Sequence, residues 1–147
     1  IMVWPGTITP GTSDRMVMGT DIMPTMLSLT DTPAPQDRLI DGANMSPLFK
    51  NANAQIHASL MMEKAGNIEA IRTQTHKLRD DVPIWGGSLV LPNIGLLPNR
   101  GAMLFNLSRD PGEYYDVTDA NPELRKTMEA QLRTAQKNWD DNKRGWK

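Results

Sequence analysis

The feature that most constrains the fold is an amphipathic pattern over residues 122–139, which predicts a helix of about five turns. Asn121 can cap the start of this helix, Pro122 suits its first position, and Glu123 favours the positive end of the helix dipole. The apolar residues that recur along one side are Leu124, Met128, Leu132, Ala135 and Trp139. A single apolar stripe of this kind has to be buried against another element, and we expect it to pack on a sheet.

Strand-length runs precede the helix and predict a small antiparallel sheet of three or four strands. Residues 57–63 and 68–73 are joined through Lys64-Ala65-Gly66-Asn67, which is typical of a hairpin turn. Residues 77–79 and 103–107 supply the further strands. The expected fold class is therefore α+β, with the sheet carrying the C-terminal amphipathic helix.

The first part of the chain predicts one strand and one helix. Residues 1–4 are apolar and stop at Pro5, which has no N–H to donate to a sheet ladder, so a short buried strand is predicted there. A helix is predicted at 22–29, with Asp21 as its N-cap and Pro24 in its first turn. We expect the chain to start in the middle of a fold, with the strand at 1–4 lacking its neighbour.

The polar residues 51–55 predict a boundary that divides the chain into 1–54 and 55–147. The first segment is expected to be a remnant of a larger α/β domain, and the second to be the sheet with its helix. Residues 80–100 form a loop that is rich in Pro and Gly and longer than a default connection. Such a loop is often functional, or else it packs against a missing neighbour.

The composition excludes several classes of function. The 147 residues include 16 basic and 17 acidic side chains, and this net charge of -1 offers no surface for nucleic acid or an anionic membrane. No apolar run is long enough to span a bilayer. The sequence has no cysteine, which excludes disulfides, thiolate metal ligands and a cysteine nucleophile. We therefore expect neither nucleic acid nor a membrane as a partner.

Several short blocks stand in a fixed order along the chain. They are Trp-Pro-Gly at 4–6, Asp-x-x-Pro-Thr at 21–25, Asp-Arg-x-x-Asp-Gly at 37–42, Ala-x-Arg with a later lysine at 70–77, and Asp-Pro-Gly-Glu at 110–113. In this order they resemble the C-terminal third of a sulfatase of the alkaline-phosphatase-like superfamily. The resemblance implies a truncated alkaline-phosphatase-like fold, with residues 1–54 as the end of the catalytic domain. The residues of its structural motif are then Asp21, Pro24, Asp37, Arg38, Asp41 and Gly42.

The resemblance also implies where the chemistry lies. Sulfatases of this type use a formylglycine, made from Cys or Ser in a Cys/Ser-x-Pro-x-Arg motif, and a calcium ion held by Asp and Asn residues. In the family these elements precede the region that this chain resembles. The chain has no cysteine, and Ser46-Pro47 lacks the required spacing to an arginine. We therefore assign no catalytic residue, metal ligand or cofactor to this chain, and we predict that it does not hydrolyse sulfate esters alone.

The residues of the structural motif allow two interpretations each. Asp21 suits an N-cap better than a calcium ligand, because a carboxylate there satisfies unpaired N–H groups of the first turn. Asp37 and Arg38 either form a pair that stabilises the loop or, together with Asp41, orient a substrate. Gly42 is expected to supply an unusual backbone angle.

The candidates for substrate binding are His57, Lys77 and Trp85. His57 is the candidate to face the active-site cleft of a full-length relative. Lys77 and Arg72 could bind an anionic substrate, although outward positions on a strand explain them as well. Trp85 could stack on a sugar or an aromatic ring, and it could equally fill the gap between its loop and the sheet.

Three functions stay open from the sequence. The first is a C-terminal fragment of a sulfatase-type hydrolase, which forms the wall of a substrate pocket and docks on a missing N-terminal catalytic domain. The second is the same part of a phosphodiesterase or phosphonate hydrolase of this superfamily. The third is a stand-alone module that oligomerises through the exposed edge at 1–4. For location, the resemblance implies the periplasm or secretion. Met23 and Met26 either fill a core or lie on a surface that a partner covers.

Overall fold

The computed structural model describes residues 1–37, 39–80 and 102–142. The chain forms two compact units, Ile1–Ala58 and Ser59–Lys147, and each is described by itself. The predicted boundary after residue 54 lies near the end of the first unit. That the first unit is the remnant of a larger catalytic domain stays a prediction.

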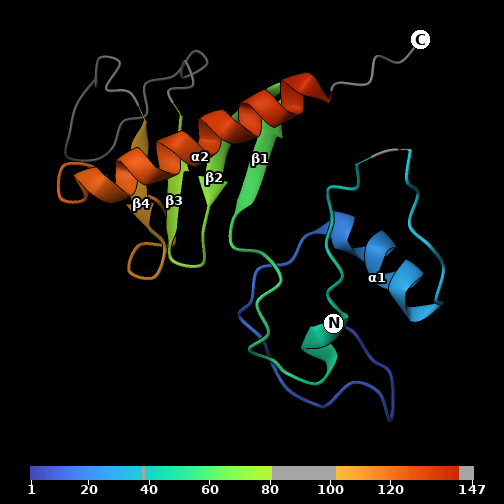
Figure 1. The fold of residues 1–147 in the computed structure, drawn as a ribbon. Helices are drawn as coiled ribbons and strands as arrows, with labels where there is room; N and C mark the ends of the chain where they lie inside the picture. Colours follow the sequence, from blue (N-terminus) through green and yellow to red (C-terminus); the bar gives the residue numbers. More distant parts are fainter. Residues whose placement is uncertain (38, 81–101, 143–147) are drawn as a thin grey trace. The chain divides into compact units, whose positions relative to one another are not determined.

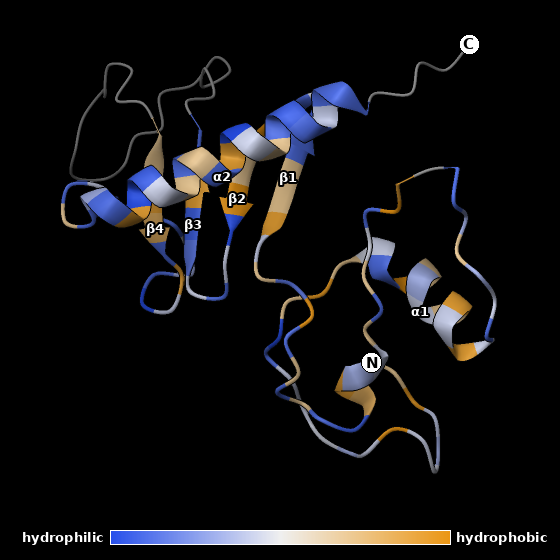
Figure 2. Ribbon diagram, in the orientation of Figure 1, coloured by the Kyte–Doolittle hydropathy of each residue, from blue (hydrophilic) through white to orange (hydrophobic). Residues whose placement is uncertain are grey.

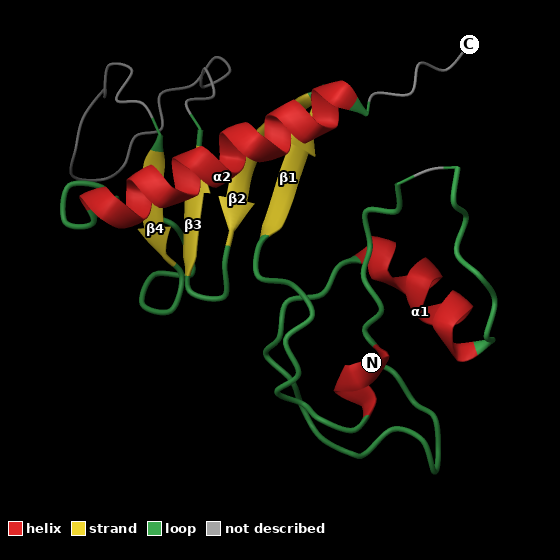
Figure 3. Cartoon of the chain, viewed as in Figure 1, coloured by secondary structure: helices red, strands yellow, loops and turns green. Residues whose placement is uncertain are grey.

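The second unit is built on a four-stranded antiparallel sheet (Figure 1 and Figure 3). Its strands are β1 (Leu60–Lys64), β2 (Asn67–Arg72), β3 (His76–Arg79) and β4 (Met103–Asn106), and they lie side by side in the order β1-β2-β3-β4. Helix α2 (Pro122–Asp141) runs across one face of this sheet. The predicted α+β class is confirmed, with a small antiparallel sheet that carries the C-terminal helix.

The core of the second unit lies between the sheet and α2. The sheet contributes Ile68, Ile71, Leu78 and Leu104, and the helix contributes Met128, Leu132 and Ala135. Figure 2 shows hydrophobic colours on parts of β1, β2 and β4, and hydrophilic ones along much of α2. The predicted apolar stripe is confirmed for these three helix residues. Trp139 departs from it and is 36% exposed, because the last turns of α2 extend past the strands (Figure 1).

The turn between β1 and β2 is the hairpin that the sequence predicts. Ala65 and Gly66 have φ angles of 50° and 88°, as a two-residue loop of the primed type requires. Gln136 of α2 anchors this turn: its Oε1 accepts the N–H of Ile68 at 2.7 Å, and its Nε2 donates to the carbonyl of Gly66 at 3.3 Å. The helix is therefore fixed on the sheet by polar as well as apolar contacts.

The first unit contains the 3-10 turn η1 (Gly19–Asp21), helix α1 (Ile22–Leu29) and the 3-10 turn η2 (Ser46–Phe49). The predicted helix at 22–29 is confirmed. The predicted buried strand at 1–4 is wrong, since these residues are exposed and pair with no strand in the described part of the chain. Without a neighbour, a strand has no partner for its ladder hydrogen bonds.

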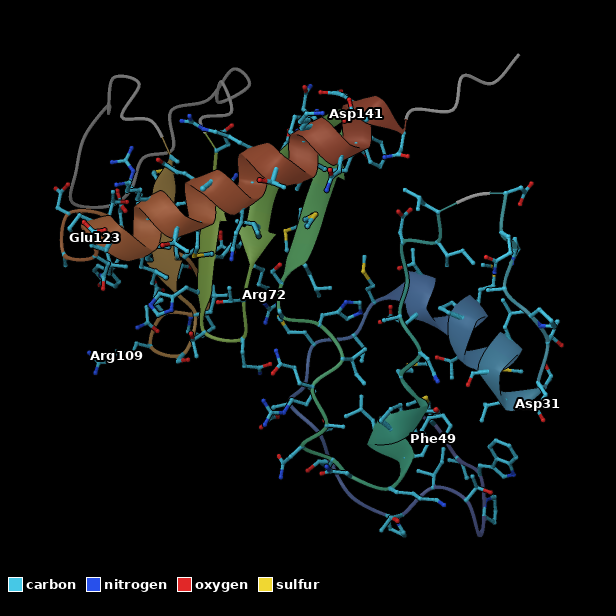
Figure 4. All side chains as sticks on the ribbon, viewed as in Figure 1. Asp31, Phe49, Arg72, Arg109, Glu123 and Asp141 are labelled. Atoms are coloured by element: carbon cyan, nitrogen blue, oxygen red, sulfur yellow. The ribbon has the colours of Figure 1, made fainter. Side chains whose placement is uncertain are left out.

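Helix α1 leaves most of its apolar side chains at the surface. Thr25 is the buried residue of this helix, whereas Ile22, Met23 and Met26 are exposed. The buried apolar side chains of the first unit are Met16, Met45 and Phe49, the last of which is labelled in Figure 4. The structure therefore places the side chains of Met23 and Met26 at the surface, and they do not fill a core.

Candidate functional site

The first unit holds a fully buried carboxylate, that of Asp21 at the end of η1, which is 0% exposed. The Nε2 atom of His57 lies 2.9 Å from Oδ1 and 2.9 Å from Oδ2 of this carboxylate. The His57 side chain is itself largely buried, with 12% of its surface exposed. The imidazole therefore meets an acidic partner within its own unit.

Two backbone N–H groups complete the surroundings of Asp21. Met18 donates to Oδ2 at 2.7 Å, and Ala43 donates to Oδ1 at 2.8 Å. The carboxylate makes no hydrogen bond to the first turn of α1, although Asp21 directly precedes that helix. The predicted capping of α1 by the Asp21 side chain is therefore wrong, because the carboxylate instead serves donors from the segments on either side.

The environment of Asp21 also sets its charge. Burial by itself would raise the pKa of this carboxyl, since a low-dielectric surrounding disfavours the charged form. The hydrogen bonds from Ala43, Met18 and His57 outweigh burial and lower the pKa of Asp21 from its ordinary value of 3.8. The carboxylate is thus ionised at neutral pH. Since it can then only accept, the Nε2 atom of His57 carries the hydrogen of their contact.

Thr25 makes a second link between the start of α1 and the segment at residues 43–45. Its Oγ1 donates to the carbonyl of Asp21 at 2.6 Å and accepts the N–H of Met45 at 2.9 Å. Asp21 and Thr25 begin and end the Asp-x-x-Pro-Thr block, and Pro24 occupies the first turn of α1, where a missing N–H costs no intrahelical hydrogen bond. The block is therefore a structural device that ties α1 to residues 43–45.

Gly42 is required by a close approach of two backbone segments. A Cβ atom at this position would overlap the carbonyl of Thr20 and lie 2.9 Å from the backbone nitrogen of Asp21. Its φ lies outside the left-handed region that Gly6 and Gly66 occupy. The predicted unusual backbone angle is therefore wrong. The absent side chain lets the loop pack on η1 and brings the N–H of Ala43 to Asp21.

The Asp-Arg-x-x-Asp-Gly block also contains the charged residues Asp37, Arg38 and Asp41. Arg38 lies outside the described residues, so the Asp37–Arg38 pair stays a prediction. Asp41 directly precedes Gly42 and is exposed. A role for these residues toward a substrate likewise stays a prediction.

The donor groups around Asp21 do not fit the calcium ion that the resemblance implies for full-length sulfatases. Both oxygens of Asp21 already accept N–H donors, which would have to leave before a cation could bind. In the described ranges, no three Asp, Glu or His side chains gather closely enough to hold a metal ion. Calcium prefers six to eight oxygen ligands, so these residues supply too few.

The second unit brings Lys77 of β3 to a carboxylate from a distant loop. Lys77 Nζ donates to Glu113 Oε1 at 2.6 Å, and Arg79 Nη1 lies 3.8 Å from Glu113 Oε2. Both partners of the closer pair are largely buried, with 15% and 21% of their side chains exposed. Lys77 is thus neutralised within its own unit, and binding of a substrate by Lys77 stays a prediction.

Sequence reasoning missed Glu113 as the partner of Lys77. Glu113 has a φ of 58° and follows the turn that begins at Asp110, whose carbonyl accepts its N–H at 3.2 Å. The Asp110 side chain accepts the N–H of Tyr115 at 2.8 Å and fixes the same loop. The Asp-Pro-Gly-Glu block predicts a turn, but no local feature of the sequence indicates which strand the Glu113 side chain contacts.

Arg72, labelled in Figure 4, lies at the end of β2 and pairs with Lys77 of β3. The register pairs Arg72 with Leu60 on one side and with Lys77 on the other, and it pairs Lys77 with Phe105. Their strand neighbours Ile71, Leu78 and Leu104 face α2, so this row lies on the opposite face of the sheet. The Nε atom of Arg72 is buried and has no hydrogen-bond partner among the residues that the structure describes.

The structure places the three predicted substrate-binding residues in different settings. His57 belongs to the first unit and Lys77 to the second, and each has the partner described above. Trp85 lies outside the described residues. Their roles toward a substrate stay predictions. In the described ranges, none of the helices is long and apolar enough to cross a membrane.

Curated proteins similar to the chain are sulfatases, although no family model matches it. An arylsulfatase of Hemicentrotus pulcherrimus is 31% identical over 136 residues, which cover 80% of this chain and 25% of the relative. Human arylsulfatase A is 28% identical over 149 residues, which cover 90% of this chain and 29% of that protein. The chain therefore spans little more than a quarter of the length of these relatives.

Solved structures are also similar to this chain in their fold. A Bacteroides thetaiotaomicron protein, from work on glycosaminoglycan metabolism, superimposes with a TM-score of 0.70 at 20% identity. The match covers 91% of this chain and 28% of that protein. The fold of this chain therefore has a counterpart within a larger known structure.

Proposed function

The chain belongs to the sulfatase family, and on this premise we propose that it forms the C-terminal part of a sulfatase-type hydrolase. The observation that carries the proposal is the set of contacts around Asp21. Two sequence blocks that resemble the family meet there, because the N–H of Ala43 donates to the Asp21 carboxylate and Gly42 packs on the backbone of Thr20. The blocks that carry the resemblance are therefore in contact with one another in this structure.

Hydrolysis of a sulfuric ester would belong to the complete protein. The calcium ion and formylglycine of full-length relatives would reside in the part that this chain does not cover. In this proposal the chain contributes the wall of a substrate pocket, with His57, Lys77 and Trp85 as the candidate residues. The chain alone would then be inactive, because the nucleophile and the metal ligands of full-length relatives would lie outside the region that it matches.

The first unit would supply the docking surface for the catalytic domain. Its exposed apolar residues on α1 are Ile22, Met23 and Met26, and further ones lie at 1–4. Exposed apolar side chains gathered on one short helix are typical of a surface that another part of a protein covers. A periplasmic or secreted location is part of the same proposal, and cell fractionation that placed the native protein in the cytoplasm would contradict it.

Two measurements on the purified chain test this proposal. The chain should release no more nitrophenol from nitrophenyl sulfate than a heat-denatured sample. It should also bind the Hemicentrotus arylsulfatase from which the matching 136 residues have been removed. Substitution of both Met23 and Met26 by Ser should weaken this binding at least about tenfold, as expected for the loss of apolar contacts. Activity of the chain alone, or failure of the two parts to associate, would contradict the proposal.

The exposed residues at 1–4 also favour a second candidate, a module that oligomerises by itself. Ile1, Val3 and Trp4 offer an unpaired apolar segment to another copy of the chain. Light scattering at high protein concentration separates the two candidates. A stable dimer that the deletion of residues 1–4 dissociates would favour self-association, whereas a monomer would count against it.

A further inference from the structure

We propose that the sheet face opposite α2 carries an oxyanion-binding site centred on Arg72, with Lys77 beside it. The guanidinium group of arginine is charged at every physiological pH. In Arg72 the Nε–H of this group is nevertheless buried and meets no hydrogen-bond acceptor in the described ranges. A buried donor that is left unpaired is costly, and the cost is recovered when a ligand accepts its hydrogen. The site goes beyond the proposed function and does not depend on it.

The distribution of charge around Arg72 favours the binding of an anion. Like charges directly opposite one another on neighbouring strands are destabilising, and Arg72 stands opposite Lys77. The Glu113 carboxylate balances the positive charge of Lys77 and, at a greater distance, that of Arg79. In the described part of the chain, no carboxylate forms a salt bridge with Arg72. One cationic charge of this row therefore lacks an anionic partner.

The neighbours of Arg72 define the class of ligand. Leu60 is half-buried on one side of Arg72, and Phe105 is buried on the far side of Lys77. Apolar neighbours lower the local dielectric and strengthen a charge-assisted hydrogen bond. The fork of N–H donors in a guanidinium matches two oxygens of a carboxylate or a sulfate group. The ligand is accordingly an oxyanion, either the sulfate group of a small ester or a carboxylate of a protein side chain.

The test follows the Nε–H resonance of Arg72 by NMR in the full 147-residue chain. Sodium sulfate is titrated in at constant ionic strength, with chloride as the balancing anion. The resonance should shift saturably, and backbone resonances of Lys77 and Phe105 should follow with the same midpoint. A shift that also appears with chloride alone, or no shift at all, overturns the site. This readout requires no variant.

Variants then assign the binding to the guanidinium. Arg72→Lys keeps a positive charge but loses the Nε donor, and it should weaken sulfate binding at least about tenfold. Arg125→Met is the matched control, since Arg125 lies on α2 and its Nε already donates to Glu129 at 2.7 Å. The control should leave the affinity unchanged. Equal affinities of wild type and Arg72→Lys would overturn the role of Arg72.

Two ligands distinguish the sources of the oxyanion. A sulfated monosaccharide represents a substrate, and a short peptide with one glutamate represents a protein segment. Tighter binding of the sugar assigns the site to a substrate group, and tighter binding of the peptide assigns it to a protein carboxylate. Both results support an oxyanion site at Arg72. Failure of both ligands and of free sulfate to shift the Arg72 resonance would overturn it.

Discussion

The Nε2 atom of His57 lies 2.9 Å from both oxygens of the Asp21 carboxylate, which is completely buried. The two residues are 36 positions apart, so their contact joins the start of α1 to the end of the first unit. Backbone N–H groups of Met18 and Ala43 share the same carboxylate. One charged side chain therefore links several separate segments of the first unit.

The first prediction concerns the loss of that charge. Asp21→Asn places an amide group where donors from Met18, Ala43 and His57 converge, so one donor is left facing another donor. We expect the first unit to lose about 2 to 4 kcal/mol of unfolding free energy. Urea unfolding, followed by NMR peak intensities of each unit, measures the loss. Asp31→Asn is the matched control, because Asp31 is exposed and Asn tolerates its φ of 50°.

The second prediction concerns pH. The pKa of Asp21 in the folded chain lies below its ordinary value of 3.8, so as pH falls the unfolded chain takes up this proton first. The contribution of Asp21 to stability is therefore fully present above 3.8 and is lost as pH falls through the folded pKa. The urea midpoint of the first unit should therefore fall as the pH is lowered through 3.8 and further below it. Asp21→Asn should flatten this dependence, and an equally steep profile in the variant would contradict it.

The third prediction concerns the backbone contact at Gly42. Gly42→Ala forces a Cβ against the carbonyl of Thr20, and backbone atoms cannot move aside as a flexible side chain could. We expect a loss of about 2 to 4 kcal/mol in the first unit, as for other strained or overpacked positions. Gly19→Ala is the control, since nothing lies within 4 Å of a Cβ there. Equal urea midpoints for the two alanine variants would show that the close approach is not formed.

The fourth prediction concerns the anchoring of α2. Gln136→Ala removes the acceptor of the Ile68 N–H and the donor to the Gly66 carbonyl. We expect the second unit to lose about 1 to 3 kcal/mol, together with faster hydrogen exchange at the Ile68 amide. Gln131→Ala, at an exposed position of the same helix, should change neither. Unaltered exchange at Ile68 in the Gln136 variant would contradict the anchoring.

The part of the fold that could be predicted follows from local sequence patterns. The periodicity of 122–139 and the cap and proline before it are properties of consecutive residues, and α2 begins at Pro122 as expected. The β1–β2 hairpin likewise follows from a turn whose residues tolerate positive φ. Trp139 fits the same periodicity and is nonetheless 36% exposed, because the pattern does not tell where the sheet beneath a helix ends.

The contacts that define the candidate site could not be predicted in this way. His57 and Asp21 are 36 residues apart, and so are Lys77 and Glu113. Periodicity does not indicate which distant segments meet, so the sequence predicts only that Asp21 caps the nearest helix and that Glu113 belongs to a turn. Gly42 was assigned an unusual φ for the same reason, since the backbone that packs on it comes from Thr20. The resemblance to a family located these residues, but their contacts came from the structure.

The central claim is that this chain is the C-terminal part of a sulfatase-type hydrolase, and a chimera tests it most directly. The 136 matching residues of the Hemicentrotus arylsulfatase are replaced by the corresponding residues of this chain, and hydrolysis of nitrophenyl sulfate is measured. We predict that the chimera folds and hydrolyses the ester, and that Asp21→Asn within it lowers the yield of folded, active enzyme. A chimera that folds, with the catalytic residues of the relative intact, and shows no hydrolysis would contradict the claim.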